Sequence, residues 1–153
     1  MKHTILSIDQ GTTSTRSIIF NENGNIIKSS QKELNLLFPK DGWVEHNPKE
    51  IILQTIQTAK SVISQTKDKV DTIGITNQRE TTLIWDKKTG IPVSNAIGWE
   101  DIRTSEYCTY LESKDFNSII KKSTGLNINP YFSATKIRWI LDSIPDGQIK
   151  AEN

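Results

Sequence analysis

The chain opens with two short apolar runs separated by a segment that is rich in hydroxyl groups. Residues 5–8 read Ile-Leu-Ser-Ile and residues 17–20 read Ser-Ile-Ile-Phe, which predicts two strands. Between them lie Asp9, Gly11, four Ser or Thr residues at positions 12–15, and Arg16. Because the second strand follows at once, this segment must close as a hairpin tip. It lacks the Gly-Lys-Ser/Thr ending of a Walker loop, which leads into a helix.

The composition of this tip is suited to phosphate binding. A tight glycine turn brings backbone N–H groups close to an anion, and hydroxyls and an arginine add further donors. A carboxylate such as that of Asp9 can hold a hydrated Mg²⁺. An ordinary polar hairpin turn explains the same residues equally well, so the segment alone leaves both interpretations open.

The first third of the chain predicts a three-stranded antiparallel meander. The strands are expected at Thr4–Asp9, Arg16–Phe20 and Ile26–Lys32. The Asn-Gly pair at 23–24 favours a tight turn between the second and third strands, because both residue types tolerate positive φ.

A helix is expected to begin after Asn47, a favoured N-cap residue, with Pro48 at its first position. Apolar residues recur at helical spacing and predict the face that packs on the core. They are Ile52, Ile56, Ala59 and Ile63. Residues 70–76 follow as an almost wholly apolar strand, which favours a central place in a sheet.

The second half predicts shorter elements. We expect a strand at Thr82–Trp85, a turn at 86–90, helical structure from about Arg103, and a short helix capped by Asp115. Ser133 is expected to cap a last helix. Strands followed by mixed elements indicate an α/β lobe.

Bulk properties exclude several classes of function. The 153 residues suffice for one domain, and 19 Lys and Arg against 18 Asp and Glu give a net charge of +1. This balance predicts neither a nucleic-acid nor a membrane partner. With a single cysteine, Cys108, the chain cannot form an internal disulfide. The two histidines, His3 and His46, are far apart in sequence, so neither is expected to bind a metal. The apolar start is too short for a signal peptide, so a cytoplasmic protein is expected.

A second polar constellation follows the strand at 70–76. Residues 76–82 read Thr-Asn-Gln-Arg-Glu-Thr-Thr, and ligands of open α/β sheets bind beyond the carboxyl ends of strands. Arg79 and Glu80 offer donors and an acceptor to a small polar molecule, although a surface ion pair is the alternative. Trp99 and Tyr131 suit the walls of a pocket around a carbon skeleton, or plain core packing.

Taken together, these segments resemble the N-terminal part of the glycerol kinases, which belong to the carbohydrate kinases with an actin- and hexokinase-type ATPase fold. The matching stretches are Asp-Gln-Gly-Thr-Thr-Ser at 9–14, Gly-Trp-Val-Glu-His at 42–46, Gly-Ile-Thr-Asn-Gln-Arg-Glu-Thr-Thr at 74–82, Trp-Asp-Lys-Lys-Thr-Gly at 85–90 and Asn-Pro-Tyr-Phe-Ser at 129–133. The first is shared widely among sugar kinases and actin-like ATPases. The third and last together are specific to glycerol kinases.

The resemblance implies a fold, substrates and roles for individual residues. The fold is a partial ribonuclease H-like or actin-like ATPase lobe, with the antiparallel three-strand meander followed by α/β elements. ATP, Mg²⁺ and glycerol are the implied ligands. Thr12, Thr13, Ser14 and Arg16 would contact nucleotide phosphates, and Asp9 would hold Mg²⁺ through water. Arg79, Glu80 and Tyr131 would hold the glycerol hydroxyls, and Trp99 would pack on the glycerol carbons.

The chain departs from this family in sequence details and in length. Ile102 and Ala134 replace an arginine and a glycine that are usual there. Residues 1–153 correspond to the first lobe only, so the general base and the adenosine site are expected outside them. Two alternatives therefore stay open. The chain is a non-catalytic fragment that needs a partner chain with the missing lobe, or it belongs to another polyol or sugar kinase.

Overall fold

The computed structural model describes residues 3–152. The chain forms two compact units. The first contains the chain up to Leu36 together with His46–Arg79, and the second contains Leu37–Glu45 together with the chain from Glu80 onward. Each unit is described by itself below.

The first unit is built on a four-stranded sheet. Its strands are β1 (Thr4–Gln10), β2 (Ser14–Asn21), β3 (Ile26–Glu33) and β6 (Thr72–Asn77), in the order β3-β2-β1-β6. The antiparallel pairing of β1 with β2 and of β2 with β3 confirms the predicted meander. Strand β6 is parallel to β1, which places the ends of both strands at the same edge of the sheet.

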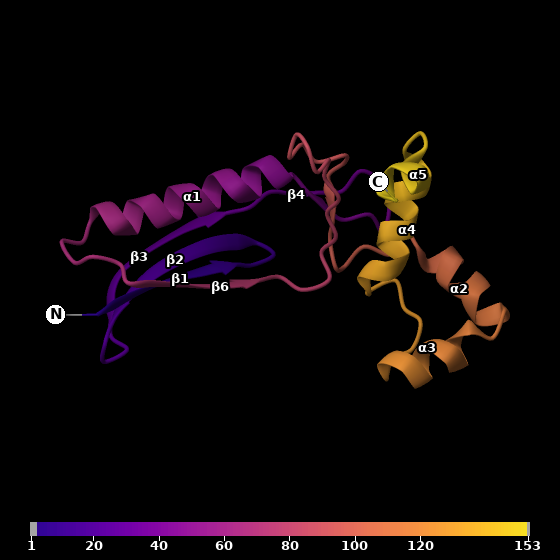
Figure 1. Ribbon diagram of the computed structural model, residues 1–153, viewed down its shortest axis with the longest axis horizontal. Helices are drawn as coiled ribbons and strands as arrows, with labels where there is room; N and C mark the ends of the chain where they lie inside the picture. Colours follow the sequence, from indigo (N-terminus) through magenta and orange to yellow (C-terminus); the bar gives the residue numbers. More distant parts are fainter. Residues whose placement is uncertain (1–2, 153) are drawn as a thin grey trace. The chain divides into compact units, whose positions relative to one another are not determined.

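Helix α1 (Pro48–Ser64) lies along one face of this sheet (Figure 1). It begins as predicted, because the Asn47 side chain accepts a hydrogen bond from the Lys49 N–H. Its buried face, however, differs from the predicted stripe. Val62 packs in the core with Leu6, Ile8 and Ile19, whereas three of the predicted core residues are exposed. These are Ile52, Ile56 and Ile63.

The fourth predicted residue, Ala59, does pack against the core, and hydroxyl pairs explain why the rest of the predicted stripe was wrong. The Thr58 and Ser17 hydroxyls lie 2.9 Å apart, and those of Thr55 and Thr15 lie 3.3 Å apart. Polar residues of the helix therefore face polar residues of β2, and hydrogen bonding compensates for their burial. A rule that assigns only apolar residues to the core cannot find such a face.

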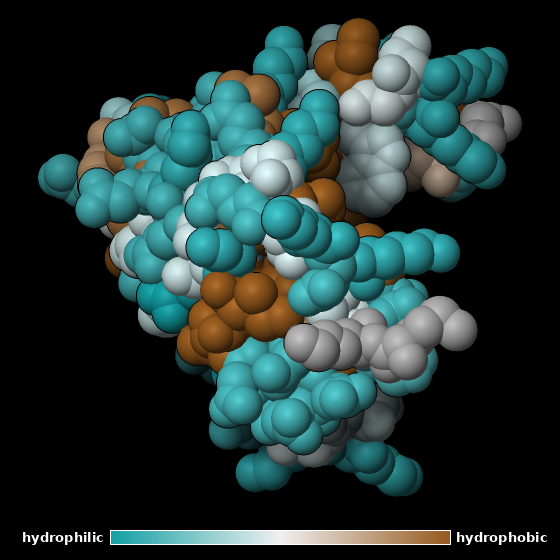
Figure 2. Space-filling view, turned by 90° about the vertical axis from the view of Figure 1, so that its left-hand side faces the viewer, coloured by the Kyte–Doolittle hydropathy of each residue, from teal (hydrophilic) through white to brown (hydrophobic). Residues whose placement is uncertain are grey.

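The apolar segment at 70–76 forms a strand as predicted, but this strand does not lie at the predicted central position in the sheet. Within the described residues, β6 pairs only with β1 and forms an edge of the sheet. Ile75 is 72% exposed on it, because α1 packs mainly over β2 and β3. Apolar surface of this kind appears in brown among hydrophilic side chains on the face shown in Figure 2.

The second unit contains short helices and little sheet. The helices are α2 (Ser105–Ser113), α3 (Phe116–Thr124), α4 (Ser133–Ser143) and α5 (Gly147–Ala151). The strands of this unit are two residues long: β7 (Ala96–Ile97) lies wholly in it, and β4 (Leu36–Leu37) and β5 (Glu45–His46) contribute Leu37 and Glu45 to it, in the order β4-β5-β7. The predicted strand at Thr82–Trp85 is absent, and only single bridges form there, from Thr82 to Ile97 and from Trp85 to Pro92.

Two predicted helix caps also need correction. Asp115 precedes α3 as expected, but its side chain makes no capping hydrogen bond and its φ is 59°. Phe132, and not Ser133, holds the N-cap position of α4. Ser133 is the first residue of the helix, so its hydroxyl is available for another partner.

A buried arginine organises the interior of the second unit. Nη2 of Arg103 lies 2.8 Å from a carboxylate oxygen of Glu45 and 2.8 Å from one of Asp101. Its guanidinium is stacked 3.8 Å from the ring centroid of Trp43 and 4.7 Å from that of Trp139. Asp101 also accepts a hydrogen bond from the Val44 N–H. This cluster joins the segment before β5 to the turn before α2 and to α4.

No helix among residues 3–152 is long and apolar enough to cross a lipid bilayer.

Candidate functional site

The hydroxyl-rich tip between β1 and β2 is a tight, well-supported hairpin. The Gly11 N–H donates a 2.9 Å hydrogen bond to the Ser14 carbonyl, which closes the tip. A Cβ on Gly11 would lie 3.0 Å from that same carbonyl oxygen, a tight contact that favours glycine at this turn. The Leu34 N–H donates to the Thr13 carbonyl at 2.9 Å and ties the tip to the end of β3.

Asp9 and Arg16 face each other across the base of this tip. They are register partners in the β1–β2 ladder, and Thr76 of β6 is the partner of Asp9 on the other side. Their neighbours Ile8 and Thr15 are buried on the face that α1 covers, so Asp9 and Arg16 project from the opposite face, and both are exposed. Arg16 Nε donates to Gln31 at 2.8 Å, and Gln31 donates to the Ser14 hydroxyl at 3.1 Å.

The tip fits a phosphate-bound Mg²⁺ better than a metal held by protein alone. Among the described residues, no group of three or more His, Cys, Asp or Glu side chains gathers at one point. Mg²⁺ typically uses one or two carboxylates, several waters and substrate phosphates, and one exposed carboxylate beside exposed hydroxyls supplies the protein's share. Asp9 and Thr13 are both exposed in this hairpin, so their side chains are accessible to such an ion.

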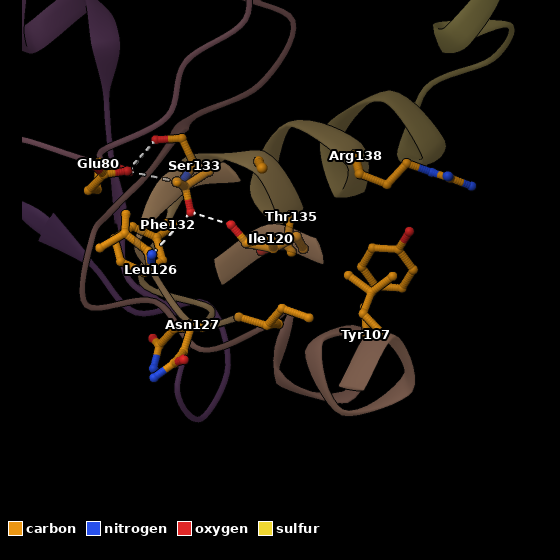
Figure 3. A pocket seen from close by; sticks show the side chains of 14 residues that line it. Glu80, Tyr107, Ile120, Leu126, Asn127, Phe132, Ser133, Thr135 and Arg138 are labelled. Atoms are coloured by element: carbon orange, nitrogen blue, oxygen red, sulfur yellow. Dashed lines mark hydrogen bonds between the residues drawn. The ribbon is translucent and has the colours of Figure 1, made fainter. Parts of the chain in front are cut away.

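Glu80 is held in a strained backbone conformation at the start of the second unit. Its φ is 61°, which is uncommon for a residue with a side chain. The Glu80 carboxylate accepts hydrogen bonds from the Ser133 N–H at 3.0 Å and from the Ser133 hydroxyl at 2.8 Å (Figure 3). The first turn of α4 therefore fixes this carboxylate, and Ser133, the predicted helix cap, serves as its donor.

Trp99 and Tyr131 meet as an aromatic pair. Their ring centroids are 6.0 Å apart with an angle of 69° between the planes, which is an edge-to-face contact. Both side chains are half-buried, so each keeps part of its ring surface accessible. The Tyr131 N–H donates to the Asn129 side chain at 2.8 Å and sets the turn that carries the ring.

Lys136, which sequence reasoning missed, connects the backbones of these site residues. Its ammonium donates to the Tyr131 carbonyl at 2.9 Å and to the Glu80 carbonyl at 3.3 Å. The pKa of Lys136 is lowered to about 8, mainly by burial and to a smaller extent by the charge of Arg103, while Asp101 and Glu80 act in the opposite direction. A signal was present in the sequence, because Lys136 lies four residues before the buried Ile140 on the same helical face.

A pocket of about 490 Å³ adjoins Glu80 in the second unit. Figure 3 shows Glu80 on one side of it and Tyr107 and Arg138 on the other. Apolar side chains of α2, α3 and the segment before α4 form most of the wall, among them Leu111, Ile120, Leu126, Ile128 and Phe132. Trp99 and Tyr131 do not line this pocket.

The structure thus groups some of the predicted site residues and leaves others apart. Asp9, Thr12, Thr13, Ser14 and Arg16 share the hairpin of the first unit. Glu80, Trp99 and Tyr131 belong to the second unit, where Lys136 connects Glu80 to Tyr131. Arg79 is exposed and ends the first unit, one residue before Glu80.

Comparison with known families decides the assignment of the chain. Residues 4–153 match the FGGY family of carbohydrate kinases, N-terminal domain. The chain belongs to the FGGY carbohydrate kinases.

Curated relatives of this FGGY chain are glycerol kinases. The protein from Geobacillus sp. (strain WCH70) is 50% identical over 155 residues, covering 99% of this chain and 31% of the relative. The protein from Bacillus velezensis is 52% identical over 156 residues, covering all of this chain and 32% of the relative. The chain thus spans about a third of the length of these relatives, and the predicted resemblance to glycerol kinases is confirmed.

Solved structures confirm the predicted fold of the FGGY chain. Plasmodium falciparum glycerol kinase with ADP has a TM-score of 0.92 and 40% identity, covering 99% of this chain and 31% of that one. Gluconate kinase from Lactobacillus acidophilus has a TM-score of 0.86 at 22% identity, covering 94% of this chain and 29% of that one. The latter similarity shows the shared fold alone.

Proposed function

We propose that this chain is the N-terminal part of an enzyme that phosphorylates glycerol to glycerol 3-phosphate with ATP. The chain would supply the first phosphate loop and most of the glycerol pocket. The observation that carries the proposal is the identity of about 50% to curated glycerol kinases, which extends over the whole chain.

The hairpin of the first unit would bind the nucleotide phosphates. Thr12, Thr13 and Ser14 would donate hydrogen bonds to phosphate oxygens, and Arg16 would offset their charge. Asp9 would hold Mg²⁺ through water. The tip supports this proposal because it is closed by its own hydrogen bonds, and a preorganised site lowers the entropic cost of binding.

Side chains around Glu80 would bind glycerol. Arg79, Glu80 and Tyr131 would hydrogen-bond its hydroxyls, and Trp99 would pack against its carbons. The Glu80 carboxylate is already fixed by Ser133, as an oriented hydroxyl acceptor needs to be. A site built to pair hydroxyl groups discriminates strongly against analogues that lack one.

The reaction moves the terminal phosphoryl group of ATP to a glycerol oxygen. The bond from phosphorus to the ADP oxygen breaks, the new bond to glycerol forms, and the hydroxyl proton leaves to a base. Positioning and charge stabilisation account for most of the catalysis in such transfers. We place the general base and the adenosine site in a region that corresponds to the two thirds of the relatives that this chain does not match. That region would belong either to the same polypeptide or to a partner chain. We expect the enzyme to act in the cytoplasm.

A coupled ADP-release assay tests the proposal. The purified 153-residue chain is assayed with ATP, Mg²⁺ and glycerol, alone and after fusion to the remaining two thirds of the Bacillus velezensis glycerol kinase. We expect no turnover by the chain alone and glycerol-dependent turnover by the fused protein. Turnover by the chain alone that Asp9→Ala abolishes would contradict the placement of the base, and silence of the fused protein would overturn the proposed function.

The fused protein also tests the proposed glycerol residues. Arg79→Ala removes charged hydrogen bonds to a hydroxyl, so the KM for glycerol should rise by about 100-fold while the KM for ATP stays constant. Lys87→Ala, in the exposed turn at 86–90, is the matched control. An unchanged KM for glycerol in the Arg79 variant would refute the assignment of that residue.

A further inference from the structure

Lys136 is a fully buried lysine in the second unit. Its side chain has 0% exposure, and it is among the largest fully buried side chains of the chain. Taking an ammonium group out of water is costly unless hydrogen bonds replace the lost hydration. Two main-chain carbonyls provide that replacement, those of Tyr131 at 2.9 Å and Glu80 at 3.3 Å.

The two carbonyls belong to segments that are far apart in sequence. Glu80 directly follows the first unit, and Tyr131 lies in the turn before α4. The Glu80 carboxylate accepts hydrogen bonds from Ser133 of α4, and the Glu80 carbonyl accepts them from the Lys136 ammonium and from the nearby Thr82 hydroxyl, at 3.2 Å. The ammonium therefore links the backbone that carries the Glu80 carboxylate to the backbone that carries the Tyr131 ring.

The backbone of Glu80 shows why such a tie is needed. A φ of 61° at a residue with a Cβ costs about 1 kcal/mol or more and persists only where surrounding contacts enforce it. Ser133 holds the side chain of Glu80, and Lys136 and Thr82 hold its carbonyl, so both the side chain and the backbone of this residue are restrained. Strain that is maintained in this way is typical of functional sites.

We propose that Lys136 is a positioning residue of the glycerol site, which fixes the spacing of Glu80 and Tyr131 through their main-chain carbonyls. This inference rests on the function proposed above. Lys136 does not touch the substrate, because its buried side chain offers no surface to a ligand. Its effect on glycerol binding passes through the two residues that it joins.

The charge of Lys136 responds to pH in the range where enzymes are assayed. Burial lowers its pKa to about 8, and the charged groups that act on it are Asp101, Glu80 and Arg103. Above this pH the ammonium becomes an amine, and its hydrogen bonds to the carbonyls weaken because charge-assisted bonds are roughly twice as strong as neutral ones. Glycerol binding should therefore weaken as the pH rises through 8.

The first test is Lys136→Met in the fused protein described above. Methionine keeps the apolar stem and removes both hydrogen bonds, so the KM for glycerol should rise at least about 10-fold while the KM for ATP is unchanged. Lys122→Met, on the exposed surface of α3, is the control. If Lys136→Met lowers the maximal rate but leaves the KM for glycerol unchanged, the lysine has a merely structural role and the inference is overturned.

The second test needs no substitution and so does not depend on folding of the variant. The KM for glycerol of the unsubstituted fused protein is measured from pH 7 to pH 9.5, with the KM for ATP as the internal reference. We expect only the glycerol value to rise above about pH 8. A flat glycerol profile would overturn the inference and leave the proposed function standing, whereas absence of glycerol-dependent turnover at every pH would overturn both.

Discussion

The guanidinium of Arg103 lies 3.8 Å from the centre of the Trp43 ring, in a stacked position that also brings its Nη2 within 2.8 Å of two carboxylates. The side chain is 2% exposed, so cation–π attraction and ion pairing act in a largely water-excluded setting. One residue thereby connects three segments of the second unit that are distant in sequence.

Replacing Arg103 by methionine should destabilise the second unit strongly. Asp101 and Glu45 would remain as buried carboxylates without their cation, and breaking a buried pair in this way costs about 3–5 kcal/mol. Urea unfolding followed by the fluorescence of Trp43 and Trp139 measures the loss. Arg138→Met is the control, since its ion pair with Asp142 is exposed and should matter far less. Equal losses in the two variants would contradict the assigned role of the cluster.

Neighbouring residues of α1 test which helix face is buried. Val62 has 0% exposure, whereas Ile63 is 44% exposed. Val62→Ala should lower the free energy of unfolding by about 2 kcal/mol because it leaves a cavity in the core, whereas Ile63→Ala should change it by less than about 1 kcal/mol. Thermal and urea unfolding of both variants give the comparison. A greater decrease in the free energy of unfolding for Ile63→Ala would show that the helix face predicted from periodicity is the buried one.

Substitutions at two glycines of the first unit test the phosphate tip and the supporting sheet separately, because Gly11 lies in the tip and Gly74 lies in β6. A Cβ on Gly11 would press against the Ser14 carbonyl, whereas one on Gly74 would meet nothing within 4 Å. In the fused protein, Gly11→Ala should raise the KM for ATP by about 10-fold or more through distortion of the tip, and Gly74→Ala should leave it unchanged. The measurement is ADP release at saturating glycerol, and a normal KM for ATP in Gly11→Ala would argue against the phosphate role.

Lys136 should also make stability depend on pH. Its pKa is lowered from 10.5 to about 8 in the folded chain, so between these values the unfolded state binds more protons. The free energy of unfolding attributable to this group therefore increases as the pH rises from about 8 to 10.5. Urea titrations at several pH values compare the parent chain with Lys136→Met. Identical pH slopes would show that the lysine titrates normally in the fold.

Local sequence signals predicted the elements of the first unit well. The turn at Asn21–Asn25, the apolar runs of β1 and β2 and the Asn47 cap all act within a few residues, so local sequence patterns and turn chemistry suffice to find them. The buried face of α1 could not be found in this way. It is set by hydroxyl pairs such as that of Ser17 with Thr58, which depend on what the helix meets across space.

The candidate site was only partly predictable for a related reason. Glu80 stands out because it follows the end of a strand, and Trp99 and Tyr131 stand out as aromatic residues in polar or turn-like surroundings. The family resemblance assigned their roles. Lys136 was overlooked because a lysine in a helix is ordinarily solvated, and only the fold shows that its ammonium reaches two carbonyls. Ser133 was assigned to a helix cap, whereas its hydroxyl donates to Glu80.

The parallel pairing of β1 with β6 has a consequence for how the chain is made. Strand β1 reaches β2 across the tip at residues 11–13, but Thr4 finds its partner Asp71 only 67 residues later. Closing the longer loop costs more chain entropy, so the meander can assemble while β6 is still missing. During translation, one side of β1 thus stays without its neighbour until residues 72–77 have left the ribosome, and for that interval the nascent chain presents an open strand to its surroundings.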